Sequence, residues 1–289
     1  MKYGIVANPV SGKQSLDVKR RKLTEAAGIL KDVEIAGLDT TSPEEFCRCA
    51  CELAQKAAVL IVAGGDGTFS LVMNSVPKDV PLGYLPFGSG DVLRHTFGLP
   101  RDVQASARLI QNGREHLIDV ISCDGKSKAL FASIGIEGRI LLERDRHLQN
   151  DVRGLTAYGL ATLKILFDGY INADLRVAID QREIIAPGAL TAVVTKVPYY
   201  GYAFKVVPQA RVDDGYLHLL VLRSGPFGAL YALATSLAGG NRSGDYYRAR
   251  EIAITTSTEQ LLQRNGDPEK EKRTRFSFRV LPRELKLIF

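Results

Sequence analysis

The stretch VLIVAGGDGTFSLVMNSV at residues 59–76 passes from an apolar run, through three glycines and an aspartate, to a second apolar run. The run 58–64 has the length of a buried strand, and the residues after the glycines favour a helix. A glycine turn at a strand end lets the backbone approach a phosphate, because no Cβ stands in the way. The helix, expected to begin at Thr68, offers free N–H groups. These features predict an anion-binding turn.

Asp66 lies in the middle of this turn, where a carboxylate repels phosphate. Its presence is explained if it holds Mg²⁺ or accepts a proton from an attacking hydroxyl. The alternative is an ordinary strand–helix turn that Asp66 caps. We expect the first of these, because the turn follows a buried strand at the edge where open α/β sheets bind ligands.

The glycine turn belongs to a regular alternation of expected strands and helices. Ser42, Pro43 and Glu45 form a capping box at the start of a helix over 43–56. The strands are near-continuous apolar runs, which indicates a parallel sheet covered on both faces. Strands are expected at 2–8, 33–39, 58–64 and 81–86, with helices between them and a last helix ending at Gly113.

Beyond residue 115 the pattern changes to short strands separated by turns, beginning with two strands around CDGK at 123–126. Such strands are typical of a β-sandwich. Helical stretches interrupt them at about 139–168 and 226–238. The sequence therefore predicts an α/β domain with a parallel sheet over 1–117 and a β-sandwich domain over 118–289. The last strand is a candidate to return to the first domain.

Two further turns follow expected strands of the first domain. NPVSGK at 8–13 combines a strand stop with small donors and a cation, and LPFGSGD at 85–91 ends a strand with two glycines and a hydroxyl. Carboxyl ends of parallel strands meet at one edge of a sheet. We therefore expect the three turns to form one shared phosphate pocket.

Taken in order, these motifs resemble those of the diacylglycerol kinase catalytic family, which includes bacterial lipid kinases and sphingosine kinases. NPVSGK, GGDGT and LPFGSGD are similar to the family's first three motifs, and QRNGDP stands where the family has D-G-E. The resemblance implies an NAD-kinase-like α/β lobe and a β-sandwich lobe, with ATP and Mg²⁺ in the cleft between them. It implies transfer of the γ-phosphoryl group of ATP to a lipid hydroxyl, on a diacylglycerol-like lipid or a sphingoid base, as a step of phospholipid and lipid metabolism.

The resemblance also assigns residues. Asp66 acts at the metal and phosphate, Asp267 is the proton acceptor, and a structural Mg²⁺ turn falls on Arg211, Asp214 and Tyr216. The alternative for this last turn is a plain β-turn before a strand. The implied nucleotide site comprises Asn8, Pro9, Ser11, Gly12, Lys13, Thr40 (or the adjacent Thr41), Gly64, Gly65, Gly67, Thr68, Asn74, Gly88 and Ser89.

Several positions depart from the family pattern. Ser70 and Leu71 replace an Asn–Glu pair, Asp91 and Val92 replace Asn–Asp, Asn265 replaces the first acid of D-G-E, and Lys196 replaces an Asn. These changes remove carboxylates, so they are expected to weaken Mg²⁺ binding. A nucleotide-binding protein with little or no kinase activity is therefore the second hypothesis. An NAD kinase, which shares GGDGT, is the third; the NPVSGK and NGDP segments argue against it.

The composition limits the setting of this activity. The net charge of +6 and pI of about 9.1 favour anionic partners. No nucleic-acid-binding motif is present, so we expect no nucleic-acid partner. No apolar run of about 20 residues occurs, and the cysteines 47, 49, 51 and 123 lack zinc spacing, which predicts core thiols in a reducing cytoplasm.

Contact with a membrane surface is expected from outside the bilayer. The basic runs 19–22 and 269–275 are either solvated faces or contacts to anionic lipid, and FGALYALATSLAGG at 227–240 is either a lipid-touching flap or a core helix. The sequence thus predicts a cytoplasmic protein peripheral to the membrane. Pairing of sandwich edges in a homodimer is left open.

Overall fold

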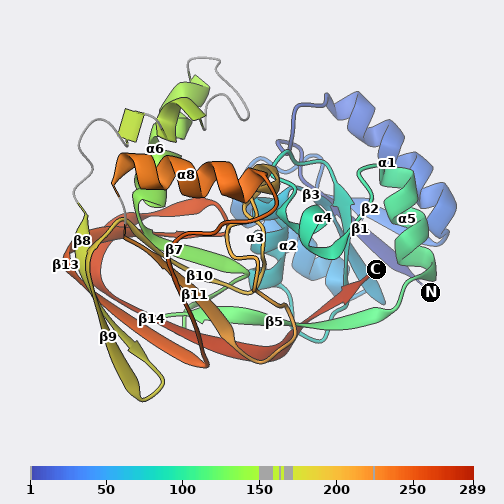
Figure 1. The fold of residues 1–289 in the computed structure, drawn as a ribbon. Coiled ribbons are helices and arrows are strands. Elements are labelled where there is room, and N and C mark those ends of the chain that lie inside the picture. The colour runs from blue at the N-terminus through green and yellow to red at the C-terminus, as the bar shows by residue number, and fades with distance from the viewer. Residues whose placement is uncertain (1, 150–158, 163, 166–171, 224) are drawn as a thin grey trace. The chain divides into compact units, whose positions relative to one another are not determined.

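The computed structural model describes residues 2–149, 159–162, 164–165, 172–223 and 225–289 (Figure 1). The chain forms two compact units: Met1–Asp119 with Pro282–Phe289, and Val120–Leu281. We call them unit 1 and unit 2. The chain passes from one to the other within β5 (Glu115–Cys123) and again within β14 (Asp267–Ile288).

Unit 1 alternates strands and helices, as the apolar runs predict. Its strands are β1 (Tyr3–Ala7), β2 (Val33–Ala36), β3 (Val59–Gly64) and β4 (Leu82–Pro86), and its helices are α1 (Leu16–Leu30), α2 (Pro43–Ala54), α3 (Asp66–Ser75), α4 (Val92–Phe97) and α5 (Val103–Asn112).

The strands of unit 1 form the predicted parallel sheet, in the order β4-β3-β1-β2. One face packs on α1 and α5, where side chains such as Ile5 and Ile61 join Leu23 and Ile110 in a buried core. The opposite face meets α2 so closely that a Cβ on Gly4 would lie 2.6 Å from Cγ of Leu53. The end of β14 adds a further parallel strand beside β4.

The predicted capping box at Ser42 is confirmed: Ser42 Oγ accepts the N–H of Glu45, and the Glu45 carboxylate accepts backbone N–H groups of Thr41, at 2.7 Å, and Ser42. Two other local expectations in unit 1 need correction. Helix α3 begins at Asp66 with Gly65 as its N-cap, two residues before the expected start at Thr68. Helix α4 was not expected, because its six residues are too few to show a helical period.

The cysteines also differ from expectation. Cys123 is buried, but Cys47, Cys49 and Cys51 on α2 are partly exposed, so the prediction of core thiols is wrong for three of the four. Their helix presents them at the margin of the packed face rather than in it.

Unit 2 is built mainly of antiparallel strands, which form the predicted β-sandwich domain. Strands β8 and β9 branch from β13, outside the path β12-β11-β10-β7-β13-β14. The remaining elements of unit 2 are β6 (Ser127–Ala129), β7 (Phe131–Gly135), α6 (Ile136–Gln149), β8 (Ala173–Ile179), β9 (Arg182–Ala189), β10 (Thr191–Thr195), the short 3₁₀ turn η1 (Gly201–Ala203), β11 (Leu217–Leu222), α8 (Pro226–Leu237), β12 (Asp245–Ala249) and β13 (Glu251–Arg264).

The strands at the end of the chain are longer than expected: β13 has 14 residues and β14 has 22. Register shifts between Thr255 and Gln260, and between Leu261 and Gln263, bend β13 where it pairs with β14. Bulges of this kind increase the local twist of a strand. A bent strand of this length therefore continues through positions where we predicted separate short strands.

Helices cover part of the strands of unit 2. Helix α8 coincides with the predicted helix at 226–238, and it packs with α6 on Leu190 and Leu222 (Figure 1). The predicted helix at 139–168 begins earlier, at Ile136, and its residues 150–158, 163 and 166–168 lie outside the described residues. None of the helices that the described residues form is long and apolar enough to span a membrane.

Candidate active site

Three strand-end turns of unit 1 pack directly against one another. Asn8 Nδ2 donates to Thr68 Oγ1 at 2.9 Å, which joins the first turn to the second. The carbonyl of Gly64 accepts the N–H groups of Phe87 and Gly88, at 2.9 and 3.1 Å, which joins the second to the third. The geometry thus brings these turns together at one edge of the sheet. We call them the turn cluster: residues 8–13, 64–68 and 87–90.

Glycines are required in the turn cluster by close packing of the backbone. A Cβ on Gly12, whose φ is +70°, would lie 1.9 Å from the carbonyl oxygen of Phe87. A Cβ on Gly88 would lie 2.4 Å from Cα of Gly65. The sequence explanation, access for a phosphate, is therefore joined by a second one, contact between the turns themselves.

The start of α3 places free N–H groups in the turn cluster. With Gly65 as N-cap, the N–H groups of the first helical turn have no carbonyl partner within the helix. They lie at the positive end of the helix dipole, where phosphate groups bind favourably.

Asp66 caps a helix, but not the one it begins. Its two carboxylate oxygens accept the N–H groups of Val92, at 3.2 Å, and Leu93, at 3.1 Å, which start α4. Burial raises the pKa of Asp66; these two bonds oppose the rise, and the nearby charge of Asp91 adds to it. A half-buried carboxylate that is anchored in this way is a candidate functional group.

Asp66 retains the capacity to bind a metal. A carboxylate has about four lone-pair positions, and the two N–H groups of α4 leave some of them available. Mg²⁺ is commonly held by one or two carboxylates together with substrate phosphates. Asp66 fits that role as a single protein ligand, whereas the buried carboxylate of Asp91 is engaged by Arg94 Nε at 3.1 Å.

Lys19 stabilises the turn cluster through hydrogen bonds to its backbone. The sequence prediction did not include this residue. Although it lies in the run 19–22, it is only 2% exposed, and its ammonium donates to the carbonyls of Asn8 and Pro9. Burial lowers the pKa of Lys19. A signal was available: Lys19 shares a helical face with Leu23, and the spacing continues along the buried side of α1.

The other predicted nucleotide residues of the turn cluster are distributed over its three turns and differ in exposure. Pro9, Ser11 and Lys13 lie in the first turn, with Lys13 exposed; Gly67 lies in the second turn, and an exposed Ser89 lies in the third.

Two predicted nucleotide residues are not part of the three turns of the cluster. Thr40 follows β2 in a turn of its own, where its hydroxyl donates to the carbonyl of Gly37 at 2.7 Å. Asn74 is near the C-terminal end of α3, bonded to the carbonyl of Ser70 at 2.9 Å. With a rise of about 1.5 Å per residue, eight residues separate it from Asp66 by about 12 Å along the axis.

The predicted proton acceptor, Asp267, is an exposed residue of unit 2. It pairs with Arg264 across a two-residue hairpin turn, Asn265–Gly266, in which both residues have positive φ. Asn265 is 7% exposed, and its Oδ1 accepts the N–H groups of Leu130, at 2.8 Å, and Phe131, at 3.3 Å. Asn265 therefore fixes the turn that presents Asp267.

The loop expected to hold a structural Mg²⁺ already contains a cation. Lys196, which is fully buried, donates from Nζ to Asp214 Oδ1 at 2.8 Å and to the carbonyl of Tyr216 at 2.6 Å. Two of the predicted metal ligands are thus bound to an ammonium group, and the third, Arg211, is exposed. These residues do not fit Mg²⁺.

Asp214 has further neighbours. Arg248 Nη2 lies 3.5 Å from its other carboxylate oxygen, and His218 Nε2 lies 3.3 Å from the same oxygen. Burial raises the pKa of Asp214, but the hydrogen bond and charge of Lys196 outweigh this, so the pKa lies below its usual range. Asp214 is therefore an ionised partner of a buried cation.

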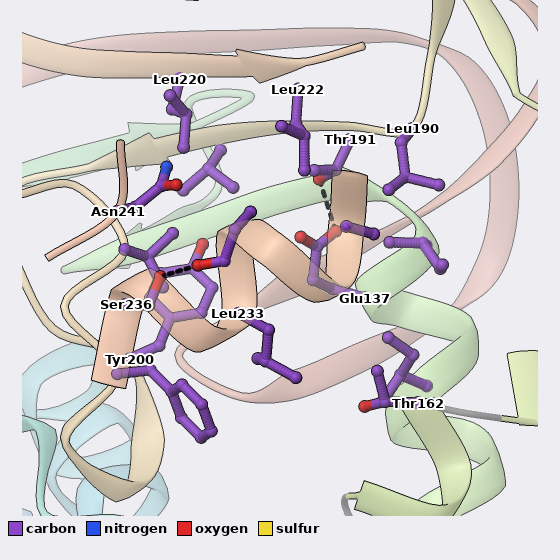
Figure 2. Close-up of a pocket in the computed structure, with 17 residues that line it drawn as sticks. Glu137, Thr162, Leu190, Thr191, Tyr200, Leu220, Leu222, Leu233, Ser236 and Asn241 are labelled. Atoms are coloured by element: carbon purple, nitrogen blue, oxygen red, sulfur yellow. Dashed lines mark hydrogen bonds between the residues drawn. The ribbon is translucent and has the colours of Figure 1, made fainter. Parts of the chain in front are cut away.

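Unit 2 also contains an apolar pocket that sequence reasoning did not find (Figure 2). We call this cavity of about 100 Å³ the α8 pocket. Figure 2 shows Glu137 and Thr191 on one side of it, Ser236 and Asn241 on the other, and leucines between. Its lining is Ile136, Glu137, Ile140, Thr162, Leu190, Thr191, Val193, Tyr200, Phe204, Val206, Leu220, Leu222, Ala229, Ala232, Leu233, Ser236 and Asn241.

Glu137 is the carboxylic acid of this lining. Thr191 Oγ1 donates to its Oε2 at 2.5 Å, as Figure 2 shows. Burial raises the pKa of Glu137 to about 7, against the opposing effect of this hydrogen bond. A carboxyl that is protonated in part at neutral pH both donates and accepts hydrogen bonds.

Comparison with protein families gives two matches that divide the chain. Residues 2–123 match the diacylglycerol kinase catalytic domain, and residues 132–289 match the YegS C-terminal NAD kinase beta sandwich-like domain.

Individual relatives agree with these matches. A diacylglycerol kinase of Staphylococcus saprophyticus is 26% identical over 276 residues, 91% of this chain and 88% of the relative. The solved structure of a putative diacylglycerol kinase of Bacillus anthracis superposes with a TM-score of 0.82 at 20% identity, covering 100% of this chain and 97% of that one. An NAD kinase of Archaeoglobus fulgidus, solved in complex with ATP, gives a TM-score of 0.50 at 14% identity, with coverages of 100% and 93%.

Proposed function

The chain belongs to the diacylglycerol kinase family, with both its catalytic domain and its C-terminal sandwich domain, and we propose that it transfers the γ-phosphoryl group of ATP to a lipid hydroxyl. Membership of this family supports a lipid kinase. The observation that carries the lipid assignment is the α8 pocket, which is the kind of site an apolar chain requires.

The size of the α8 pocket defines what it would hold. A cavity of about 150 Å³ lined by aliphatic side chains accepts a ligand the size of benzene. At about 100 Å³ the α8 pocket therefore takes a segment of an apolar chain, not a whole lipid. Glu137 would meet a polar group of that ligand, either the glycerol-ester region of a diacylglycerol-like lipid or the amine and hydroxyls of a sphingoid base.

The outer side of α8 is suited to a membrane surface. Phe227 is 82% exposed, and Tyr231 and Leu237 are each 55% exposed. The segment 225–241 contains no charged residue, while Arg223 and Arg242 flank it. An exposed apolar surface of this kind marks a site of contact with a membrane or with another protein. We propose that α8 places the α8 pocket beside the lipid surface.

The chemistry follows from positions and charges. The turn cluster would hold the ATP phosphates with the N–H groups of α3. Mg²⁺, held by Asp66 and the phosphates, would neutralise the charge that develops during transfer. Asp267 would accept the proton of the lipid hydroxyl, and Asn265 keeps its turn in place. Thr40 and Asn74 would contribute outside the turn cluster.

The direct test is phosphoryl transfer from labelled ATP, with Mg²⁺, to vesicles that contain diacylglycerol, ceramide or a sphingoid base, and to NAD in solution. A labelled lipid is expected, at a rate at least about a hundredfold lower in Asp66→Asn. Asn keeps an acceptor toward α4, so equal melting temperatures of the two proteins assign the loss to chemistry. Labelled NAD alone would contradict the lipid assignment.

A failed transfer also has a defined meaning. If no acceptor is labelled while ATP raises the melting temperature, the chain is a nucleotide-binding protein without kinase activity. The membrane contact is tested by sedimentation with anionic vesicles. The pair Phe227→Ser and Tyr231→Ser is expected to stay in the supernatant, whereas unchanged sedimentation would refute contact through α8.

A further inference from the structure

The segment 211–218 and the end of β10 form a closed electrostatic unit. The backbone N–H of Lys196 bonds to the carbonyl of Leu130 at 2.8 Å, which fixes the origin of its side chain. From there Nζ reaches Asp214 and Tyr216 at hydrogen-bond distance, with none of the side chain exposed. A buried ammonium is stable only when its donors are satisfied and its charge is paired. Asp214 pairs the charge of Lys196, and Asp214 and Tyr216 accept two of its three donors.

The neighbouring His218 does not supply this positive charge. The backbone N–H of Arg211 donates to His218 Nε2 at 3.1 Å, so this nitrogen is an acceptor. The other ring nitrogen, Nδ1, then carries the proton and lies 2.6 Å from the hydroxyl of Tyr246. Burial lowers the pKa of His218 and outweighs the attraction of Asp214, in agreement with a neutral ring. Lys196 is thus the fully buried cation that faces Asp214.

A divalent ion does not fit beside this ammonium. Mg²⁺ requires near-octahedral oxygen ligands at about 2.0–2.1 Å. Asp214 Oδ1 and the carbonyl of Tyr216 already accept Nζ of Lys196. An added Mg²⁺ would bring two positive charges next to a third in a buried setting, where repulsion is weakly screened.

We infer that Lys196 is the built-in cation of this loop, and that the chain holds residues 211–218 in place without a structural divalent ion. The ammonium does two things that a structural metal would do: it neutralises Asp214, and it ties that carboxylate to a backbone carbonyl two residues later. Because the cation is a side chain of the residue that follows β10, and so cannot dissociate, the loop keeps its conformation when divalent ions are removed.

The wild-type protein provides the first test. Mn²⁺, used without nucleotide, is titrated and the free ion is counted by its electron paramagnetic resonance signal, in parallel with Asp66→Asn and Asp214→Asn. We expect no bound Mn²⁺ that depends on Asp214. A Mn²⁺ ion that remains in Asp66→Asn and disappears in Asp214→Asn would overturn the inference.

Variants of Lys196 provide the second test. Lys196→Met leaves Asp214 without its buried partner, so we expect the melting temperature to fall by about 10 °C. The exposed Lys126→Met is the matched control and is expected to melt as the wild type does. Lys196→Asn frees Asp214 Oδ1 and the carbonyl oxygen of Tyr216 as possible metal ligands. We expect the melting temperature of this variant to be lowest in EDTA and to rise in part when Mg²⁺ is added.

The two experiments separate folding from cation binding. A Lys196→Met protein that melts within about 2 °C of the wild type would show that the ammonium does not hold the loop. If the Lys196 variants do not fold, the Mn²⁺ titration of the wild type still decides, because it requires no change at Lys196.

Discussion

The turn cluster of unit 1 and the α8 pocket of unit 2 are built from different materials. In the turn cluster, backbone meets backbone, and glycines stand where a Cβ would collide with a carbonyl or with another Cα. In the α8 pocket, side chains from several strands and helices surround a small apolar space, with a carboxyl at one side (Figure 2). In the proposed function the turn cluster would bind phosphate through N–H groups, and the α8 pocket would bind a lipid chain through apolar contacts.

This difference determines how each site responds to substitution. A glycine with positive φ and a carbonyl 1.9 Å from its notional Cβ has no tolerated replacement. An apolar lining changes its volume by degrees, because neighbouring side chains move to accommodate a new one. Substitutions of these glycines should therefore abolish ATP binding. Substitutions in the α8 pocket should reduce lipid binding by an amount that depends on the size of the new side chain.

The largest effect is expected from Gly12→Ala. Its methyl group would collide with the carbonyl of Phe87, and alanine at φ +70° is strained. We expect a loss of at least about 3 kcal/mol in the free energy of unfolding. We also expect ATP to lose its effect on the melting temperature. Thermal unfolding with and without ATP measures both.

Gly28→Ala is the matched control. Gly28 lies within α1 with nothing within 4 Å of a notional Cβ, so alanine should stabilise the helix by about 0.5–1 kcal/mol. ATP should still raise the melting temperature of this variant. Equal losses in the two variants would show that the turn cluster has no special need for glycine.

A graded effect is expected from Ala232→Leu. Ala232 is buried on α8 and lines the α8 pocket, so the larger side chain takes up space that a lipid chain would fill. We expect kcat/KM for the lipid to fall roughly tenfold to a hundredfold. Stabilisation by ATP should be unchanged. Ala178→Leu, exposed on β8 of the same unit and outside the pocket lining, should leave both quantities at the wild-type level.

Unchanged lipid kinetics in Ala232→Leu, with the protein folded and binding ATP, would remove the α8 pocket from the lipid site. The kinase assignment would stand in that case, because it depends on family membership and on the turn cluster. Only the turn cluster would then remain as a proposed ligand site, for ATP.

The sequence was informative where function depends on short, local patterns. Each turn of the cluster occupies about five residues, and the apolar runs before them set their place at one sheet edge, so the sheet and the meeting of the turns could be predicted. The α8 pocket could not, because its lining is spread from residue 136 to 241 and consists of residue types common in any core.

Pairings over long separations were missed for a related reason. The carboxylate of Asp66 bonds to backbone N–H groups 26 and 27 residues later, and a backbone donor has no signature in the side chains. Lys196 was recognised as unusual, but its partner Asp214 was assigned to a metal instead. A lysine at a position expected to be polar and neutral, together with an acidic turn, was the available signal.

The smallest effect is expected from Glu137→Gln. The carboxyl has an ordinary pKa of 4.5 in the unfolded chain and about 7 when folded, so the folded state binds the additional proton between these values. Stability from Glu137 is therefore present below about pH 4.5 and is lost as the pH rises toward 7. Between pH 5 and 7 the loss in the free energy of unfolding should be about 2 kcal/mol, which corresponds to a few degrees in melting temperature.

The Glu137→Gln variant tests this. Glutamine keeps an acceptor for Thr191 and does not titrate, so the melting temperature of Glu137→Gln should overtake that of the wild type across this range. The exposed Glu259→Gln should follow the wild type. Parallel curves for all three proteins would mean that the α8 pocket contains no group that titrates near neutral pH.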